Sequence, residues 1–573
     1  MQDNLPSTEM PITIKPFVES TVPFAGQNVQ RVDFADSETA AAITLEGLDG
    51  QSVFLVKVNR SNSVVNLYDT GHAYPERDES GRAFFPSGGP QAASAAFPYP
   101  PDDTEPSISG IFTTGDGIIT RYDHPGVQEF NNNHPPPGGT VPGRAFRAVS
   151  PARQSVLEDS RQFWVESSND NFNITQTSQW KQITAVLRAQ GTHSNIWISE
   201  DNFSAQNNNQ NIQDNKVTIR QAAMLAKKFD AIYDYTTPIF GFEYGGGVPE
   251  TDETFGGIDG ETRIQILIYD IDFDQSPGQN SGTFGYFWAK DHYTNSRYYS
   301  NKAEIFYIDS FFMDSFPDAI YSTLAHEFQH MIQFNEKELK RELPSAATWY
   351  NEMLSLLAED MIAPLIGVSS SNDQHPSKNR IPMFLGYYNY AGITEWRSGN
   401  YSMISYANVY AFGAYMVRNY GGADLVREIA GNDSIDMLSI NQALGKINGG
   451  MTEGQEFTEA LSRYGEALVY SGINQPKGVH TFDQEDSKII NDINYIFSGF
   501  DIWKMNFSNT ELDSFVFPIY NGPLVWDLRW TFEMRGHSII LQSLKEWQNV
   551  KGDLVIEAQK PKSDYIDLYI LIR

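Results

Sequence analysis

The sequence predicts an α+β protein with β-rich ends and a central region in which strands are followed by helices. Two observations lead to this prediction. Short runs of β-branched and aromatic residues, bounded by turn residues, occur near both ends and again between about residues 160 and 310. From residue 317 to about residue 470, apolar residues instead recur at helical spacing. Strands that precede helices are typical of α+β domains, and a chain of 573 residues is long enough for roughly two to four domains.

Residues 1–70 are expected to form a small N-terminal β domain of the sandwich type. Turn residues separate its β-rich runs, and Asp49-Gly50 predicts a β-hairpin. Residues 71–145 have a different composition, rich in Gly, Pro, Ser and Asn, and we expect them to be mainly irregular. The β-rich runs of the N-terminal domain are 12–14, 29–34, 40–45, 53–58 and 64–68.

The remaining chain is expected to divide into a central domain at residues 146–475 and a C-terminal β domain at residues 476–573, again of the sandwich type. In the central domain we expect a helix at 217–235 and further helices after residue 317. Its expected strands are 163–165, 184–188, 195–198, 263–270, 285–288 and 303–309. The expected C-terminal strands are 515–517, 524–526, 538–541, 554–556 and 565–572.

The composition excludes several kinds of site and partner. With 72 acidic and 41 basic residues the net charge is −31, which disfavours binding to nucleic acid or to anionic membranes. The absence of cysteine excludes disulfides, a thiolate zinc site and a cysteine nucleophile. No run of 18 apolar residues exists, so we expect no membrane span. The first residues lack a basic and an apolar stretch, so we expect the protein to be either cytosolic, or secreted or placed at the cell surface after removal of its signal. The abundance of Asn, Gly, Tyr and Trp favours export.

The most specific motif is His326-Glu327-Phe328-Gln329-His330, the zincin pattern HExxH. On a helix, His326 and His330 point from the same face, where two imidazoles can hold one Zn²⁺. Glu327 lies about 100° round the helix, beside the ion, where a carboxylate can take a proton from water. Pro317 and Asp318 suit the first turn of this helix. The alternative is a pair of core histidines satisfied by hydrogen bonds.

Two glutamates on a second predicted helix, at residues 348–360, complete the candidate site. Glu352 and Glu359 are two turns apart and share one face, and buried carboxylates need a partner. We expect Glu352 to be the third zinc ligand and Glu359 to accept a hydrogen bond from a ligand histidine. Because they lie about 10.5 Å apart along the helix, only one can bind the ion. Two histidines and one glutamate leave a fourth position open for water.

A calcium site is a further candidate. Asp270, Asp272 and Asp274 occupy alternate positions before a Ser-Pro-Gly turn, and their carboxylates suit Ca²⁺. The spacing departs from the EF-hand pattern, whose last ligand would fall on Ser281. The alternative is a solvated acidic loop.

These motifs resemble the hyicolysin family of bacterial metallopeptidases. The resemblance rests on the HExxH helix, on Trp349-Tyr350-Asn351-Glu352 and Ala358-Glu359-Asp360, and on the strand segment 284–288. It covers about residues 150–470. The family belongs to the gluzincins, in which two histidines and a downstream glutamate bind zinc. The resemblance implies a thermolysin-like fold, with a twisted sheet above the motif helix and a helical lower half. It also places the third ligand at Glu352.

A second resemblance, to the gluzincin aminopeptidases, concerns Tyr406. In those enzymes a catalytic tyrosine is followed nine residues later by an aromatic residue and then by Gly-Gly, as are Tyr406, Tyr415 and Gly421-Gly422. The resemblance implies that Tyr406 donates a hydrogen bond to the oxyanion. Val409 stands where those enzymes have glycine, and the alternative is an ordinary packed aromatic residue. Their GxMEN signature, which seats a free amino terminus, is absent, and this favours internal cleavage.

The predicted function is that of a zinc-dependent endopeptidase with one Zn²⁺ per chain and protein or peptide substrates. Zinc would lower the pKa of its water, and Glu327 would act as general base and then as general acid. An edge strand, either 285–288 or 303–309, is expected to align an extended substrate. Two alternatives remain open: an aminopeptidase, and an inactive zincin fold that serves as a surface binding or adhesion module.

Overall fold

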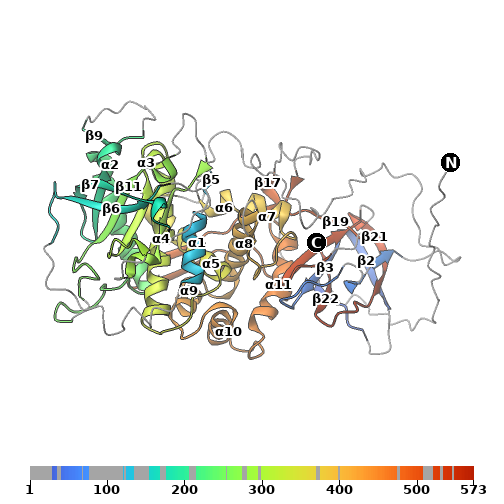
Figure 1. Ribbon diagram of the computed structural model, residues 1–573. Coiled ribbons are helices and arrows are strands. Elements are labelled where there is room, and N and C mark those ends of the chain that lie inside the picture. The colour runs from blue at the N-terminus through green and yellow to red at the C-terminus, as the bar shows by residue number, and fades with distance from the viewer. Residues whose placement is uncertain are drawn as a thin grey trace, which may run out of the picture.

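The structure is a computed structural model. It describes residues 29–34, 40–66, 69–71, 73–75, 120–121, 124–134, 154–167, 176–205, 215–252, 255–273, 281–293, 298–368, 375–397, 401–473, 478–507, 520–528, 533–544 and 547–573. Figure 1 shows a mixed sheet at one end of the molecule, helices in the middle and a second group of strands at the other end. Helices and sheets together confirm the α+β class. Among the helices described, none is long and apolar enough to cross a membrane.

A six-stranded mixed sheet carries the candidate site at one edge. Its order is β13-β14-β11-β8-β7-β6, in which β14, β11 and β8 run parallel and the other neighbours pair antiparallel. The three parallel strands are buried throughout, as their apolar sequences predict. Of the two strands expected to align a substrate, only β13 lies at an edge. The strands are β6 (Ser160–Glu166), β7 (Trp180–Gln190), β8 (Ser194–Ser199), β11 (Ile264–Tyr269), β13 (Gly285–Phe287) and β14 (Ile305–Asp309).

Helices pack against this sheet and fill the centre of the molecule (Figure 1). The predicted helix near residue 217 begins with a capping box, in which Thr218 and Gln221 satisfy each other's backbone N–H groups. Both helices of the candidate site form where the sequence predicts them. The helices are α2 (Ile219–Phe240), α3 (Ser310–Ser315), α4 (Pro317–Gln333), α5 (Thr348–Ile362), α6 (Pro376–Asn379), α7 (Ile381–Tyr387), α8 (Ser402–Tyr420), α9 (Gly422–Gly431), α10 (Asp436–Ile447) and α11 (Glu456–Tyr470).

The second group of strands comes from both ends of the chain. One sheet has the order β1-β22-β3-β20-β19 and another the order β2-β21-β4. The sequence predicted separate N- and C-terminal β domains, but strands from the two ends pair with each other, and the five-stranded sheet packs on α11. Hydrophobic alternation shows which face of a strand is buried but not which strand lies beside it. The strands are β1 (Val29–Arg31), β2 (Ala40–Gln51), β3 (Val53–Asn59), β4 (Ala73–Pro75), β19 (Trp526–Asp527), β20 (Ser538–Ser543), β21 (Val550–Gln559) and β22 (Ile566–Ile572).

The hairpin predicted at Asp49-Gly50 does not form. Strand β2 continues through this dipeptide, with a register shift between Asp49 and Gln51 where it pairs with β21. The next strand, β3, pairs with β22 and β20 in the other sheet. Gly50 has a φ of +86°, so glycine is required there for an irregular strand rather than for a tight turn.

The segment predicted as irregular contains helix α1 (Pro125–Asn133). Its single Gly and three Asn residues lower helix propensity, which explains why the sequence pattern did not predict it. The predicted strands at 12–14 and 515–517 lie outside the described residues, as does Asp274. Short strand pairs complete the structure: β5 (Thr120–Arg121) with β12 (Ser281–Gly282), β9 (Phe203–Ser204) with β10 (Val217–Thr218), β15 (Asp486–Ile490) with β16 (Ile493–Phe497), and β17 (Asn506–Phe507) with β18 (Tyr520–Asn521).

Candidate metal centre and active site

Helix α4 carries the HExxH residues through the interior of the protein. Pro317 occupies its first turn and Asp318 adds a negative charge there, which stabilises the N-terminus. From Ala319 to Gln333 every residue except His330 is buried, and α4 packs against β13 on one side and α5 on another. Two imidazoles and a carboxylate in such surroundings cost on the order of several kcal/mol unless other groups pair with them.

Three donor atoms from α4 and α5 converge on one point. The Nε2 atoms of His326 and His330 are 3.1 Å apart. Glu352 Oε2 lies 3.1 Å from Nε2 of His326 and 3.6 Å from Nε2 of His330. Ligand atoms of a tetrahedral ion with bonds of about 2.0–2.2 Å are about 3.3–3.6 Å apart, so this group has the dimensions of a three-ligand metal site.

The electrostatics of the site favour an ionised ligand. Burial acts to raise the pKa of the Glu352 carboxyl, but the His330 and His326 imidazoles outweigh burial and hold this pKa below its ordinary value. The side chain is therefore a carboxylate in the folded protein. A carboxylate and two imidazole nitrogens are donors that a divalent metal accepts.

Glu359 lies on the far side of the His326 ring. Its Oε1 atom is 2.7 Å from Nδ1 of His326, while Nε2 of the same ring faces Glu352. A carboxylate at Nδ1 holds the proton on that nitrogen, which leaves Nε2 free to bind a metal. Glu352 and Glu359 therefore contact opposite nitrogens of the same ring.

Ser355 supports the other histidine and was not predicted from the sequence. Its Oγ atom lies 3.1 Å from Nδ1 of His330 and donates to the carbonyl oxygen of Asn351 at 3.1 Å. The hydroxyl also donates to Gln329 Oε1 at 2.5 Å and lies 3.3 Å from Nε2 of His330, so it contacts the ring while its own proton goes to another acceptor. Positions 352, 355 and 359 share one helix face. The helical spacing that relates the two glutamates could therefore also have indicated Ser355, which lies between them.

Glu327 lies beside the three donors and not among them. Its Oε2 atom accepts a hydrogen bond of 2.9 Å from the backbone N–H of Phe287 in β13. Glu327 also lines a cavity together with His330 and Glu352, whose other wall includes Gly285 and Phe287. The carboxylate is therefore fixed between the donor group and the free edge of the sheet.

Helix α1 forms another wall of the same cavity through Val127, Gln128 and Asn131. The Asn131 side chain donates to the carbonyl oxygen of Phe287 at 2.8 Å and accepts from the backbone N–H of Ala289 at 2.9 Å. One carboxamide thus pairs with the edge of β13 as a neighbouring strand would. The contribution of α1 to the cavity was not foreseen from the sequence.

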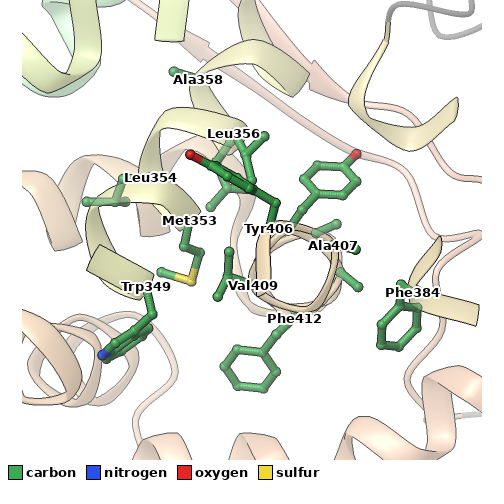
Figure 2. Close-up of a cluster of buried hydrophobic side chains, with 14 of the residues drawn as sticks. Trp349, Met353, Leu354, Leu356, Ala358, Phe384, Tyr406, Ala407, Val409 and Phe412 are labelled. Carbon is green, nitrogen blue, oxygen red and sulfur yellow. The ribbon is translucent and has the colours of Figure 1, made fainter. Parts of the chain in front are cut away.

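Tyr406 lies away from this cavity. Figure 2 shows it on α8 among buried hydrophobic side chains that include Met353 and Leu356. Its ring is 1% exposed and contacts Trp396 edge-on at 4.8 Å, and the cavity lining does not include it. The structure thus brings together five of the six predicted site residues, and Tyr406 is the exception.

Asp270 and Asp272, which were predicted as calcium ligands, have different surroundings. Asp272 follows β11 in a short 3₁₀ turn and lies near His124, the N-terminal cap of α1, with Asp272 Oδ1 3.8 Å from His124 Nε2. The carbonyl oxygen of Asp270 accepts a hydrogen bond of 3.3 Å from the backbone N–H of Phe273, which closes that turn. No group of described residues combines the two aspartates in one metal-binding cluster.

Comparisons with known proteins agree with this geometry. The sequence profile of the family Peptidase M30 matches residues 173–487, which is more than half of the chain and includes both helices of the candidate site. The neutral metalloprotease ShpI of Staphylococcus hyicus is 26% identical over 366 residues, which cover 59% of this chain and 70% of that protein. The resemblance to hyicolysins is thereby confirmed: the chain belongs to the Peptidase M30 family of metallopeptidases.

Proposed function

We propose that the protein is a zinc-dependent endopeptidase. The observation that supports this most strongly is the convergence of His326, His330 and Glu352, with Glu327 beside them on the wall of a cavity. Two imidazoles and one carboxylate form a donor set typical of catalytic zinc, with a position left for water. A bound zinc ion would supply Lewis acidity toward the scissile carbonyl and lower the pKa of water.

The residues around the ion have separate tasks. Glu359 fixes the ring of His326 through Nδ1, and Ser355 contacts the ring of His330, while the two Nε2 atoms face the same point. Glu327 takes a proton from the attacking water and delivers it to the leaving amine, as general base and then general acid. The hydrogen bond from Phe287 N–H holds the Glu327 carboxylate in place.

The edge of β13 is the proposed guide for an extended substrate. Asn131 occupies the Phe287 carbonyl oxygen at the end of β13 and the Ala289 N–H just beyond the strand, and Phe287 also contacts Glu327. A peptide added as a further strand would use the same groups and would pass the donor cluster along its length. An internal peptide bond would therefore reach the site without a free amino terminus.

Three expectations remain part of the proposal. The oxyanion role of Tyr406 stays a prediction, because its position inside the hydrophobic cluster offers it no direct support. Export from the cell is favoured by the composition, as stated above. A thermolysin-like arrangement is consistent with a sheet edge packed on the motif helix.

The mode of cleavage is tested with fluorogenic peptides that carry an acetylated amino terminus and an amidated carboxyl terminus. The endopeptidase proposal predicts that blocked peptides and matched peptides with free termini are cut internally at similar rates. Glu327→Gln protein serves as the control for contaminating peptidases. Cleavage of the free peptide alone, one residue at a time from its amino terminus, would show an aminopeptidase instead.

A further inference from the structure

A second group of buried titratable side chains meets at the first turn of α1. His124 precedes α1, Glu166 ends β6, and Asp272 follows β11. One donor atom from each lies within 4.8 Å of the others. His124 and Glu166 are 1% and 0% exposed, and the Asp272 side chain is 10% exposed. These residues come from three distant parts of the chain, so local structure alone does not bring them together.

The charge on the buried carboxylate of Glu166 is the central feature of this group. Glu166 Oε2 accepts from the Tyr286 hydroxyl at 2.7 Å while its other oxygen accepts from Tyr269. In the part of the chain that the structure describes, no Lys or Arg forms an ion pair with Glu166. Lys181 and Lys290 attract it at longer range, but the Lys181 ammonium lies over the Phe273 ring and Lys290 is hydrogen-bonded to Asp291 at 2.7 Å. Buried carboxylates in such surroundings are ordinarily paired or bound to a metal.

We propose that His124, Glu166 and Asp272 form a second divalent-cation site, separate from the HExxH centre. One imidazole and two carboxylates suit zinc or manganese, whereas calcium prefers oxygen ligands alone. His124 Nε2 and Asp272 Oδ1 are 3.8 Å apart, slightly more than the roughly 3.3–3.6 Å between ligands of tetrahedral zinc. The two tyrosine hydroxyls on Glu166 would orient this ligand from behind.

Binding through Nε2 requires the His124 proton to sit on Nδ1. The backbone N–H of Val127 now lies 3.3 Å from Nδ1, so the ring must turn slightly away from it. Val127 N–H keeps an acceptor in that case, because it also lies 3.1 Å from the carbonyl oxygen of His124. The cap of α1 is therefore preserved when the ring binds a metal.

The ion would fasten α1 to the sheet beside the proposed active site. His124 and Tyr286 line the same cavity as Glu327, so an ion can enter from solvent through that opening. The site uses none of the HExxH residues, and it does not depend on the proposed peptidase mechanism. It gives Asp272 a metal-binding role different from the all-aspartate calcium loop expected from the sequence.

The test is a count of metal ions per chain. Full-length protein is stripped with a chelator, reloaded with excess zinc, desalted and measured by inductively coupled plasma mass spectrometry. Wild-type protein should retain two zinc ions, and His124→Ala and Asp272→Asn should each retain one. The control His193→Ala, which changes a histidine 3.6 Å from Asp234, should retain two. Asp272→Asn preserves the shape of the side chain, so its result stands even where His124→Ala fails to fold.

Location and metal preference are tested separately. Crystals of reloaded protein should show an anomalous scattering peak at the zinc edge among the three side chains, and His326→Ala crystals should keep this peak while losing the other. A single zinc per wild-type chain, bound at the HExxH centre, would overturn the second site. Two retained ions in Asp272→Asn would also overturn it. Occupation by calcium in competition with zinc would overturn the assigned metal class.

Discussion

The carboxylate of Glu359 offers a quantitative test of how the candidate metal centre is organised. Its Oε1 atom is 2.7 Å from Nδ1 of His326, and the two side chains are only 4% and 1% exposed. A buried hydrogen bond to a charged group contributes about 1.5–3 kcal/mol. At about 1.4 kcal/mol per tenfold, that range corresponds to roughly 10- to 150-fold in zinc affinity, in agreement with the usual effect of groups that orient a ligand.

Two substitutions of Glu359 separate the effect of its charge on zinc affinity from the effect of its hydrogen bond. Glu359→Gln keeps an acceptor oxygen but removes the charge, so we expect zinc affinity to fall by about tenfold. Glu359→Ala also leaves the Nδ1–H of His326 buried without its acceptor, so we expect a fall of about 100-fold. Zinc affinity is measured by competition with a chromophoric chelator. Asp234→Asn, which alters an exposed partner of His193, should leave the affinity unchanged.

The comparison with Glu352 gives the result that would refute this reasoning. Glu352→Gln removes a proposed ligand and should lower zinc affinity far more than Glu359→Gln does. If Glu359→Gln abolishes zinc binding while Glu352→Gln leaves it intact, the two roles are reversed. If neither Glu359 variant changes the affinity, the contact at Nδ1 does not organise the site.

Three further predictions follow from buried or bridging side chains. Burial raises the pKa of Glu243 to about 7 from 4.5, so the folded protein keeps a proton that the unfolded chain loses. Stability should therefore fall by up to about 3 kcal/mol as pH rises from 4.5 to 7, and Glu243→Gln should remove this dependence in urea unfolding curves. Asn131→Ala removes two hydrogen bonds to the β13 edge, so kcat/KM for a long peptide should rise by up to about 100-fold, and an unchanged value would mean that substrates avoid this edge. Tyr406→Phe removes a hydroxyl that has no hydrogen-bond partner among the described residues, so the free energy of unfolding should not decrease. A fall in kcat of about 10²–10³-fold would assign that hydroxyl to the oxyanion, and an unchanged kcat would assign the side chain to packing.

The candidate metal centre was largely predictable because its residues lie at helical spacing within two short stretches of sequence. Helical geometry alone places His326 and His330 on one face of α4, and Glu352 and Glu359 on one face of α5. Apolar spacing then indicates that both helices are buried, so that their charged faces must meet a partner. The pairing of the two helices was the remaining step, and the family resemblance supplied it.

The pairing of the terminal strands, helix α1 and the second cluster of titratable residues depend on contacts between distant segments. The periodicity of apolar residues does not encode such contacts. The longer strands of both chain ends were predicted, whereas β4 lies in the segment predicted as irregular, and the mutual pairing of the two ends joins residues such as Val29 and Leu571. Helix α1 has weak helix propensity, and its contacts with the edge of β13 stabilise it instead. The cluster of His124, Glu166 and Asp272 likewise arises only when three separate elements pack together.

The central claim, metal-assisted hydrolysis with Glu327 as the base, is tested most directly by Glu327→Gln. This variant keeps the size of the side chain and all proposed zinc ligands, but the amide cannot accept the proton from water. Zinc content and casein digestion are measured on the same preparations of wild-type and variant protein. We predict equal zinc content and a fall in kcat of several orders of magnitude, on the order of 10³-fold or more. Digestion by Glu327→Gln at a rate near that of the wild type would contradict the account.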